Sequence, residues 1–158
     1  MKRILKWIGI LIVVFIVGGQ AVRPARTNPT VDPSRTMQAH TQMTPQVAAI
    51  LQRSCSNCHS YKTVWPWYSQ VAPASWLVIR DVNEGRGHMN MSDWSQYDAK
   101  HASRKLDGIC KEVSGGDMPP SYYLIMHSDE KLSDSDKQTL CDWAKAESQR
   151  VAALPKDN

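Results

Sequence analysis

The chain has 158 residues, which is room for one compact domain and a short appendage. Its formal net charge is +4 at pH 7, but Lys2, Arg3 and Lys6 carry three of these charges at the extreme N-terminus. The remainder is close to neutral and has no basic stripe interleaved with aromatic side chains. These features argue against a nucleic-acid-binding protein.

The N-terminus has the layout of an export signal. The basic residues are followed by an uncharged run from Trp7 to Val22, and the small residues Gly19 and Ala21 offer a cleavage site. The run has 16 residues, slightly fewer than the roughly 17–25 of a membrane span. Its Ile, Val and Leu content favours an uncleaved anchor over a cleaved signal. In either case we expect residues 1–22 to direct the rest of the chain to the periplasm.

Residues 23–43 are rich in proline, threonine and polar side chains, and Pro24, Pro29 and Pro33 interrupt any helix. We expect this segment to be a tether that holds a domain away from the membrane. The domain itself is expected over residues 44–153.

Helical periodicity runs through this domain. A first helix should begin at Thr44 and Pro45 and run into Cys55, because Thr is a good N-cap and Pro suits the first helical position. A second helix should extend from Pro73 to about Glu84 and end at the next glycines. These glycines are Gly85 and Gly87.

Two further helices are expected. One covers residues 99–113, with an apolar face at the spacing i, i+3, i+4, i+7, and Ser133 should cap a last helix that reaches about Val151. Residues 121–127 could add a short turn. Because no segment alternates like a strand, the sequence predicts an all-α domain.

Residues 55–59 read Cys-Ser-Asn-Cys-His, and a C-x-x-C-H run is typical of c-type haem attachment. The thiols of Cys55 and Cys58 would form thioethers with the haem vinyl groups, and His59 would bind the iron. A C-x-x-C pair also occurs in zinc sites and thiol redox proteins. A second pair of zinc ligands at suitable spacing and a βαβ pattern are both missing from the sequence, so these two alternatives are weaker.

Four aromatic rings follow between Tyr61 and Tyr68, around a proline that prevents a regular helix. A loop with this much apolar surface needs a large apolar partner. We expect Trp65, Trp67 and Tyr68 to cover a porphyrin face. The alternative is that they form part of an ordinary core.

Met118 lies between two glycines upstream and Pro119-Pro120 downstream, which favour an extended, rigid loop. Such a loop could present the thioether as the second axial ligand of a haem iron, and Met/His ligation raises the reduction potential. The alternative is a methionine that fills a gap in the core.

Two cysteines remain outside the motif. Cys110 and Cys141 both lie on or beside apolar helix faces. In an exported domain a disulfide between them is favoured over two buried thiols, and it could contribute about 3 kcal/mol.

Together these motifs resemble the bacterial haem-binding-domain family of small exported c-type haem proteins. The likeness covers residues 23–150 and rests on the C-x-x-C-H run, on the Thr-Val-Trp-Pro-Trp-Tyr-Ser run at 63–69 and on the Gly-Asp-Met-Pro-Pro run at 116–120. The resemblance implies one covalent haem c, held by Cys55 and Cys58 with His59 on the iron. We expect a small cytochrome-c-like helical domain wrapped around it.

Three functions are compatible with this reading. The first is a monohaem electron carrier, six-coordinate through Met118, that exchanges electrons with a redox protein at the membrane. The second is a haem sensor or peroxidase-like enzyme with an exchangeable sixth ligand, for which His88, His101 and His127 are candidate distal groups. The third is a haemless thiol-redox or zinc module.

Overall fold

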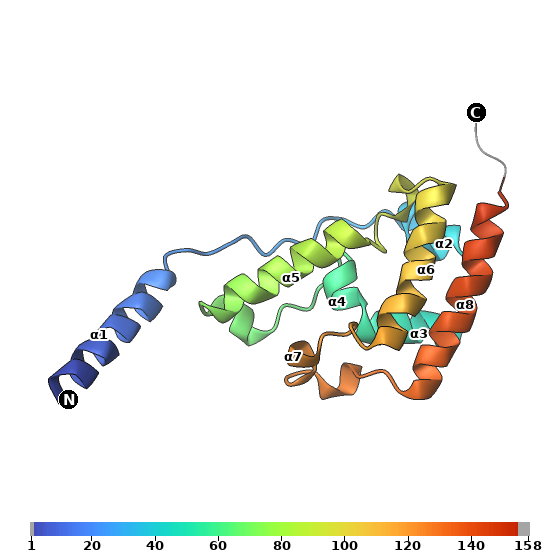
Figure 1. Ribbon diagram of the computed structural model, residues 1–158. Coiled ribbons are helices and arrows are strands. Elements are labelled where there is room, and N and C mark those ends of the chain that lie inside the picture. Colours follow the sequence, from blue (N-terminus) through green and yellow to red (C-terminus); the bar gives the residue numbers. More distant parts are fainter. Residues whose placement is uncertain (1, 155–158) are drawn as a thin grey trace.

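The computed structural model describes residues 2–154, which form helices, turns and loops without any strand (Figure 1). This confirms the predicted all-α class. The helices are α1 Lys2–Gly19, α2 Met37–His40, α3 Pro45–Ser54, α4 Ser56–His59, α5 Ala74–His88, α6 Ala99–Gly115, α7 Ser121–Leu124 and α8 Asp134–Ala152. Short 3₁₀ turns occur at Pro33–Arg35, Trp67–Gln70, Trp94–Gln96 and Ser128–Glu130.

The core lies where α6 and α8 pack along each other and α3 packs against α8. Leu106 on α6 and Leu140 on α8 are fully buried there, and Val47 and Leu51 contribute from α3. A disulfide between Cys110 and Cys141 joins α6 to α8. The helices α3, α6 and α8 therefore form the hydrophobic core of the domain.

Removing this disulfide should destabilise the domain. We expect Cys110→Ala/Cys141→Ala to lower the free energy of unfolding by about 3 kcal/mol, because the bond closes a long loop and limits the unfolded chain. Urea denaturation followed by circular dichroism measures the change. Reductant should lower the stability of the wild-type protein similarly and leave the variant unchanged; equal midpoints for the two oxidised proteins would contradict the prediction.

Two helices begin at the expected caps, and a glycine ends a third. Thr44 accepts a hydrogen bond from the backbone N–H of Val47, and Ser133 forms a reciprocal capping box with Asp136. Gly116, with φ of 83°, ends α6 in the left-handed region that favours glycine.

The second helix differs from the prediction. Gly85 and Gly87 do not end α5, which continues to His88. Glycine weakens a helix only modestly, and Gly85 is needed where α5 approaches α4, as shown below. The expectation that the glycines end the helix is therefore wrong.

The segment expected as a tether lies against the domain. In Figure 1 the blue chain after α1 runs along α5. The guanidinium of Arg86 on α5 donates to the carbonyl of Thr27 at 2.8 Å and to Asn28 Oδ1 at 2.9 Å. Farther along, Met37 on α2 is 1% exposed within the core. Residues 33–43 thus take part in the folded domain, because an apolar side chain from them is buried.

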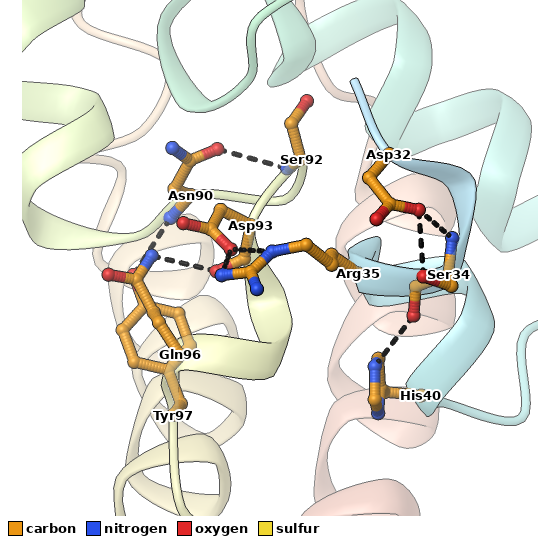
Figure 2. Close-up of polar contacts among 9 residues, drawn as sticks. All are labelled: Asp32, Ser34, Arg35, His40, Asn90, Ser92, Asp93, Gln96 and Tyr97. Carbon is orange, nitrogen blue, oxygen red and sulfur yellow. Dashed lines mark hydrogen bonds and ion pairs between the residues drawn. The ribbon is translucent and has the colours of Figure 1, made fainter. Parts of the chain in front are cut away.

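Figure 2 shows how this segment is held. Arg35 donates to Asp93 Oδ1 through Nε at 2.9 Å and through Nη2 at 2.6 Å. The loop that carries Asp93 is itself ordered by Asn90, whose N–H donates to the hydroxyl of Tyr97 at 3.0 Å. Because Arg35 is half exposed, we expect this ion pair to add little to the stability of the fold. Its main effect is to fix the position of residues 33–43 against the loop that carries Asp93.

The apolar N-terminal segment forms α1, whose side chains are exposed from Lys2 to Gly18. Its end meets the domain where the ring of Phe15 packs edge-on against Trp76, with centroids 6.4 Å apart. The side chain of Gln20 also exchanges hydrogen bonds with the backbone of Ala72. Among residues 2–154, no helix has both the length and the apolar character needed to cross a membrane.

Candidate functional site

The C-x-x-C-H motif forms a single helical turn directly after α3. Cys55 caps the start of α4, and its carbonyl accepts hydrogen bonds from the N–H groups of Cys58 at 3.2 Å and His59 at 3.0 Å. Both thiols are free and half-buried. One compact turn therefore carries both sulfur atoms and the imidazole.

The imidazole of His59 is oriented by a backbone carbonyl. Its Nδ1 lies 3.0 Å from the carbonyl oxygen of Met89. Because a carbonyl only accepts, Nδ1 carries the proton and the lone pair of Nε2 remains available for a metal. Burial lowers the pKa of His59, which favours the neutral form that a metal requires.

The motif opens into a pocket of about 520 Å³ between α4, α5, α6 and the loop before α7. In Figure 1, α4 lies between α5 and α6. The pocket brings together four sequence-predicted site residues: Cys55, Cys58, His59 and Met118. Its apolar wall includes Leu51, Ile109, Val113, Pro119 and Pro120. Such a volume suits a large, mostly apolar ligand.

Met118 reaches the pocket from the loop that follows α6. The carbonyl of Glu112 accepts hydrogen bonds from the N–H groups of Asp117 at 3.0 Å and Met118 at 3.3 Å. The left-handed Gly116 precedes them and turns the chain. Met118 is 37% exposed, so its thioether lies at the edge of the pocket.

The glycine at position 85 sets how closely α5 approaches the motif. A Cβ atom there would lie 2.7 Å from the carbonyl oxygen of Cys58 and 3.1 Å from its Cβ. At Gly87, in the same helix, a Cβ would meet no atom within 4 Å. Of these two glycines, only Gly85 is required for the packing of α5 against α4.

These two glycines form a matched pair for a test. We expect Gly85→Ala to displace Cys58 and to lower the free energy of unfolding by about 1–3 kcal/mol through overpacking. Gly87→Ala should raise it by about 0.5–1 kcal/mol, because alanine loses less backbone entropy in a helix. Urea denaturation of both variants measures the difference. Equal stability of the two would contradict the assigned role of Gly85.

The aromatic run lines a neighbouring pocket. Trp67 and Tyr68 lie on the wall of a second pocket of about 320 Å³, which adjoins the first at Asn57 and Cys58. Trp65 lines neither of these two pockets. Two of the three aromatic side chains expected to cover a porphyrin face, Trp67 and Tyr68, thus lie beside the first pocket, and Trp65 does not join them.

A polar network that the sequence does not predict binds the motif through Asn57. Asn57 Nδ2 donates to Glu130 Oε1 at 3.0 Å and to the hydroxyl of Tyr123 at 3.1 Å. That hydroxyl donates to Glu130 Oε2 at 2.6 Å. Glu130 is an ordinary acidic residue in a polar stretch of sequence, so only the fold reveals that it is buried beside the motif.

The three candidate distal histidines have different surroundings. His88 lines the first pocket. His127 stacks on Tyr123, and its Nε2 lies 2.6 Å from the hydroxyl of Tyr68. His101 pairs with Asp98 at the start of α6 and lines neither pocket. The pocket therefore contains one of the three.

The thiols do not have the character of a redox pair. Burial, followed by nearby negative charges, raises the pKa of Cys55 to about 12 and that of Cys58 to about 11. A reactive thiol instead needs a lowered pKa.

Within residues 2–154, no group of three or more His, Cys, Asp or Glu side chains is placed to hold a metal ion.

An all-helical domain whose thiol, imidazole and thioether donors share one apolar pocket is suited to binding haem. The family described as haem-binding domain matches residues 14–146, which is more than half of the chain. The chain therefore belongs to the haem-binding domain family, as its motifs predicted. Comparisons with curated proteins and with solved structures give no match.

Proposed function

We propose that the protein is a monohaem c-type electron carrier. The observation that supports this proposal best is that Cys55, Cys58, His59 and Met118 line the same pocket. Two thiols and an imidazole on one turn fit covalent attachment of a porphyrin, and the thioether offers a second axial ligand. Haem bound there supplies a one-electron couple between ferric and ferrous iron.

The thiols would attach the porphyrin by addition. Cys55 and Cys58 would each hold the porphyrin through a thioether, formed when the thiol S–H adds across a vinyl double bond, so that no electrons would be gained or lost. Both thiols must be reduced beforehand, and both are free in the structure.

The remaining site residues would tune this cofactor. His59 offers Nε2 to the iron while the carbonyl of Met89 keeps its ring oriented, which raises the basicity of the ligand. Met118, if it holds the iron, would favour the ferrous state and raise the reduction potential. With both axial positions filled, electron transfer to a redox protein partner is the expected activity.

We further propose that the domain is exported, with residues 1–22 as its signal or anchor. This proposal is supported by the basic start followed by an uncharged apolar run and by the exposure of that run on α1. A redox partner at the periplasmic face of the inner membrane would then be within reach.

Expression of the full chain together with haem-maturation machinery tests the central proposal. We expect the haem absorbance to remain with the polypeptide after denaturation, at one haem per chain. A polypeptide that denatures free of haem would overturn the proposal.

A sensor or peroxidase-like enzyme is the second candidate. It is favoured by the partial exposure of Met118 and by the presence of His88 in the same pocket. Carbon monoxide added to the ferrous protein distinguishes the two. A rapid spectral change would show an exchangeable sixth position and support the sensor or enzyme, whereas an unchanged spectrum would support the carrier.

A further inference from the structure

The first pocket has ends of opposite charge. On α5, the side chains that line it run from Asp81 to His88, a distance of about 10 Å along the helix. On α6 they run from Arg104 to Val113, which is about 14 Å. The carboxylate of Asp81 is at one end of this span, and the basic side chains of His88 and Arg104 are at the other.

The cysteines belong to the acidic end. Cys58 and Asp81 line both pockets where these adjoin, and Glu130 lines the first pocket together with the two cysteines. Glu130 is also bound to Asn57, within the motif itself. The sulfur atoms therefore lie toward Asp81 and Glu130.

The basic end lies beyond His59. His59 lies close to the end of α5, because its Nδ1 is 3.0 Å from the carbonyl oxygen of Met89, the residue after His88. The start of α6 is held at the same end, because the N–H of Asn90 donates to the hydroxyl of Tyr97 at 3.0 Å. Lys105 is half-buried, with its ammonium 5.7 Å from the centroid of the Tyr97 ring. In the described part of the chain, neither Arg104 nor Lys105 forms an ion pair with a carboxylate.

We propose that Arg104 and Lys105, assisted by His88, form a carboxylate-binding subsite that receives the two propionates of the haem. This inference rests on the proposed function and adds the orientation of the ring. The vinyl and propionate groups occupy different edges of the porphyrin. Because the cysteines hold the vinyl groups at the acidic end, the propionates extend to the end where Arg104 and Lys105 lie without ion-pair partners.

Electrostatics supports this orientation over the reverse one. With the ring turned around, two propionates would face Asp81 and Glu130, and like charges so close disfavour each other. In the proposed orientation each propionate gains a cation, which lowers its pKa by about 1–3 units when the charges are about 4–6 Å apart. Besides His88, Arg104 and Lys105, the ionisable side chains near this end are His59 and Glu84, which line the pocket, and Asp98, which caps the start of α6. Glu112 lies beside Val113, at the other end of the α6 span.

The test compares two full-length holoproteins with the same loss of charge. Arg104→Gln/Lys105→Gln removes the proposed subsite, and Lys100→Gln/Lys145→Gln removes two exposed charges that line neither pocket. The midpoint potential of each is measured by electrochemistry across a pH range. For the first variant we expect a lower potential, because nearby positive charges disfavour ferric iron and the variant has lost two of them. We also expect the apparent pKa of the propionates to rise by about one.

The control pair should match the wild-type protein in both quantities, and the charge-retaining Arg104→Lys/Lys105→Arg should largely restore them. If Arg104→Gln/Lys105→Gln behaves like the control pair, the subsite is overturned while covalent haem still supports the proposed function. If the wild-type chain carries no covalent haem, both proposals fail together. The four side chains exchanged are exposed or half-buried, so all variants should fold.

Discussion

We expect Cys55→Ser/Cys58→Ser to lose all covalently bound haem. Serine hydroxyls do not form thioethers with vinyl groups under the conditions that attach a porphyrin to thiols, and both sulfur atoms line the same pocket. Haem absorbance of the denatured polypeptide, freed from unbound haem by acid extraction, measures the effect. Compared with the wild-type chain, the signal should fall to background.

The second pair of cysteines provides the control. Cys110→Ala/Cys141→Ala removes the disulfide between α6 and α8 but leaves the motif intact, so its haem should stay attached. Haem that remains on denatured Cys55→Ser/Cys58→Ser would contradict the assigned attachment. Loss of haem from the control pair alone would have the same consequence.

Met118→Ala should abolish the methionine-to-iron charge-transfer band at the red edge of the ferric spectrum. The thioether is the only proposed sulfur ligand, and alanine cannot replace it. We also expect a lower reduction potential, because a thioether stabilises ferrous iron. Absorbance spectroscopy and potentiometry on the covalently loaded protein measure the two effects.

Met126→Ala is a matched control on the neighbouring pocket. Met126 is exposed and lines the second pocket but not the first. Its substitution should leave the band and the potential unchanged. A wild-type protein without the band, or a Met118→Ala variant that keeps it, would contradict methionine ligation and favour an exchangeable sixth position.

Much of the helical architecture could be predicted from local sequence. Thr44, Ser133 and Gly116 mark helix ends through backbone hydrogen bonds and conformations that involve only near neighbours. The C-x-x-C-H motif could be identified for the same reason, since its two cysteines and its histidine lie within one turn.

Gly85 shows where local reasoning fails. The expectation that Gly85 ends a helix is wrong, because its role depends on the backbone of Cys58, 27 positions earlier in the sequence. No pattern around Gly85 reports that approach. Met37 is similar, since a methionine among prolines and polar residues gave no sign that it enters the core.

The amino-acid sequence by itself therefore determined the all-α class and the family, and it predicts the residues that are proposed to hold haem. Tertiary structure alone decided which carbonyl orients His59, that Glu130 is buried beneath the motif, and that opposite charges gather at the two ends of the pocket. The physical reason is the range of each interaction. Helix caps and the attachment turn depend on residues a few positions apart, whereas a pocket is formed by side chains from α3 to α7 that only packing brings together.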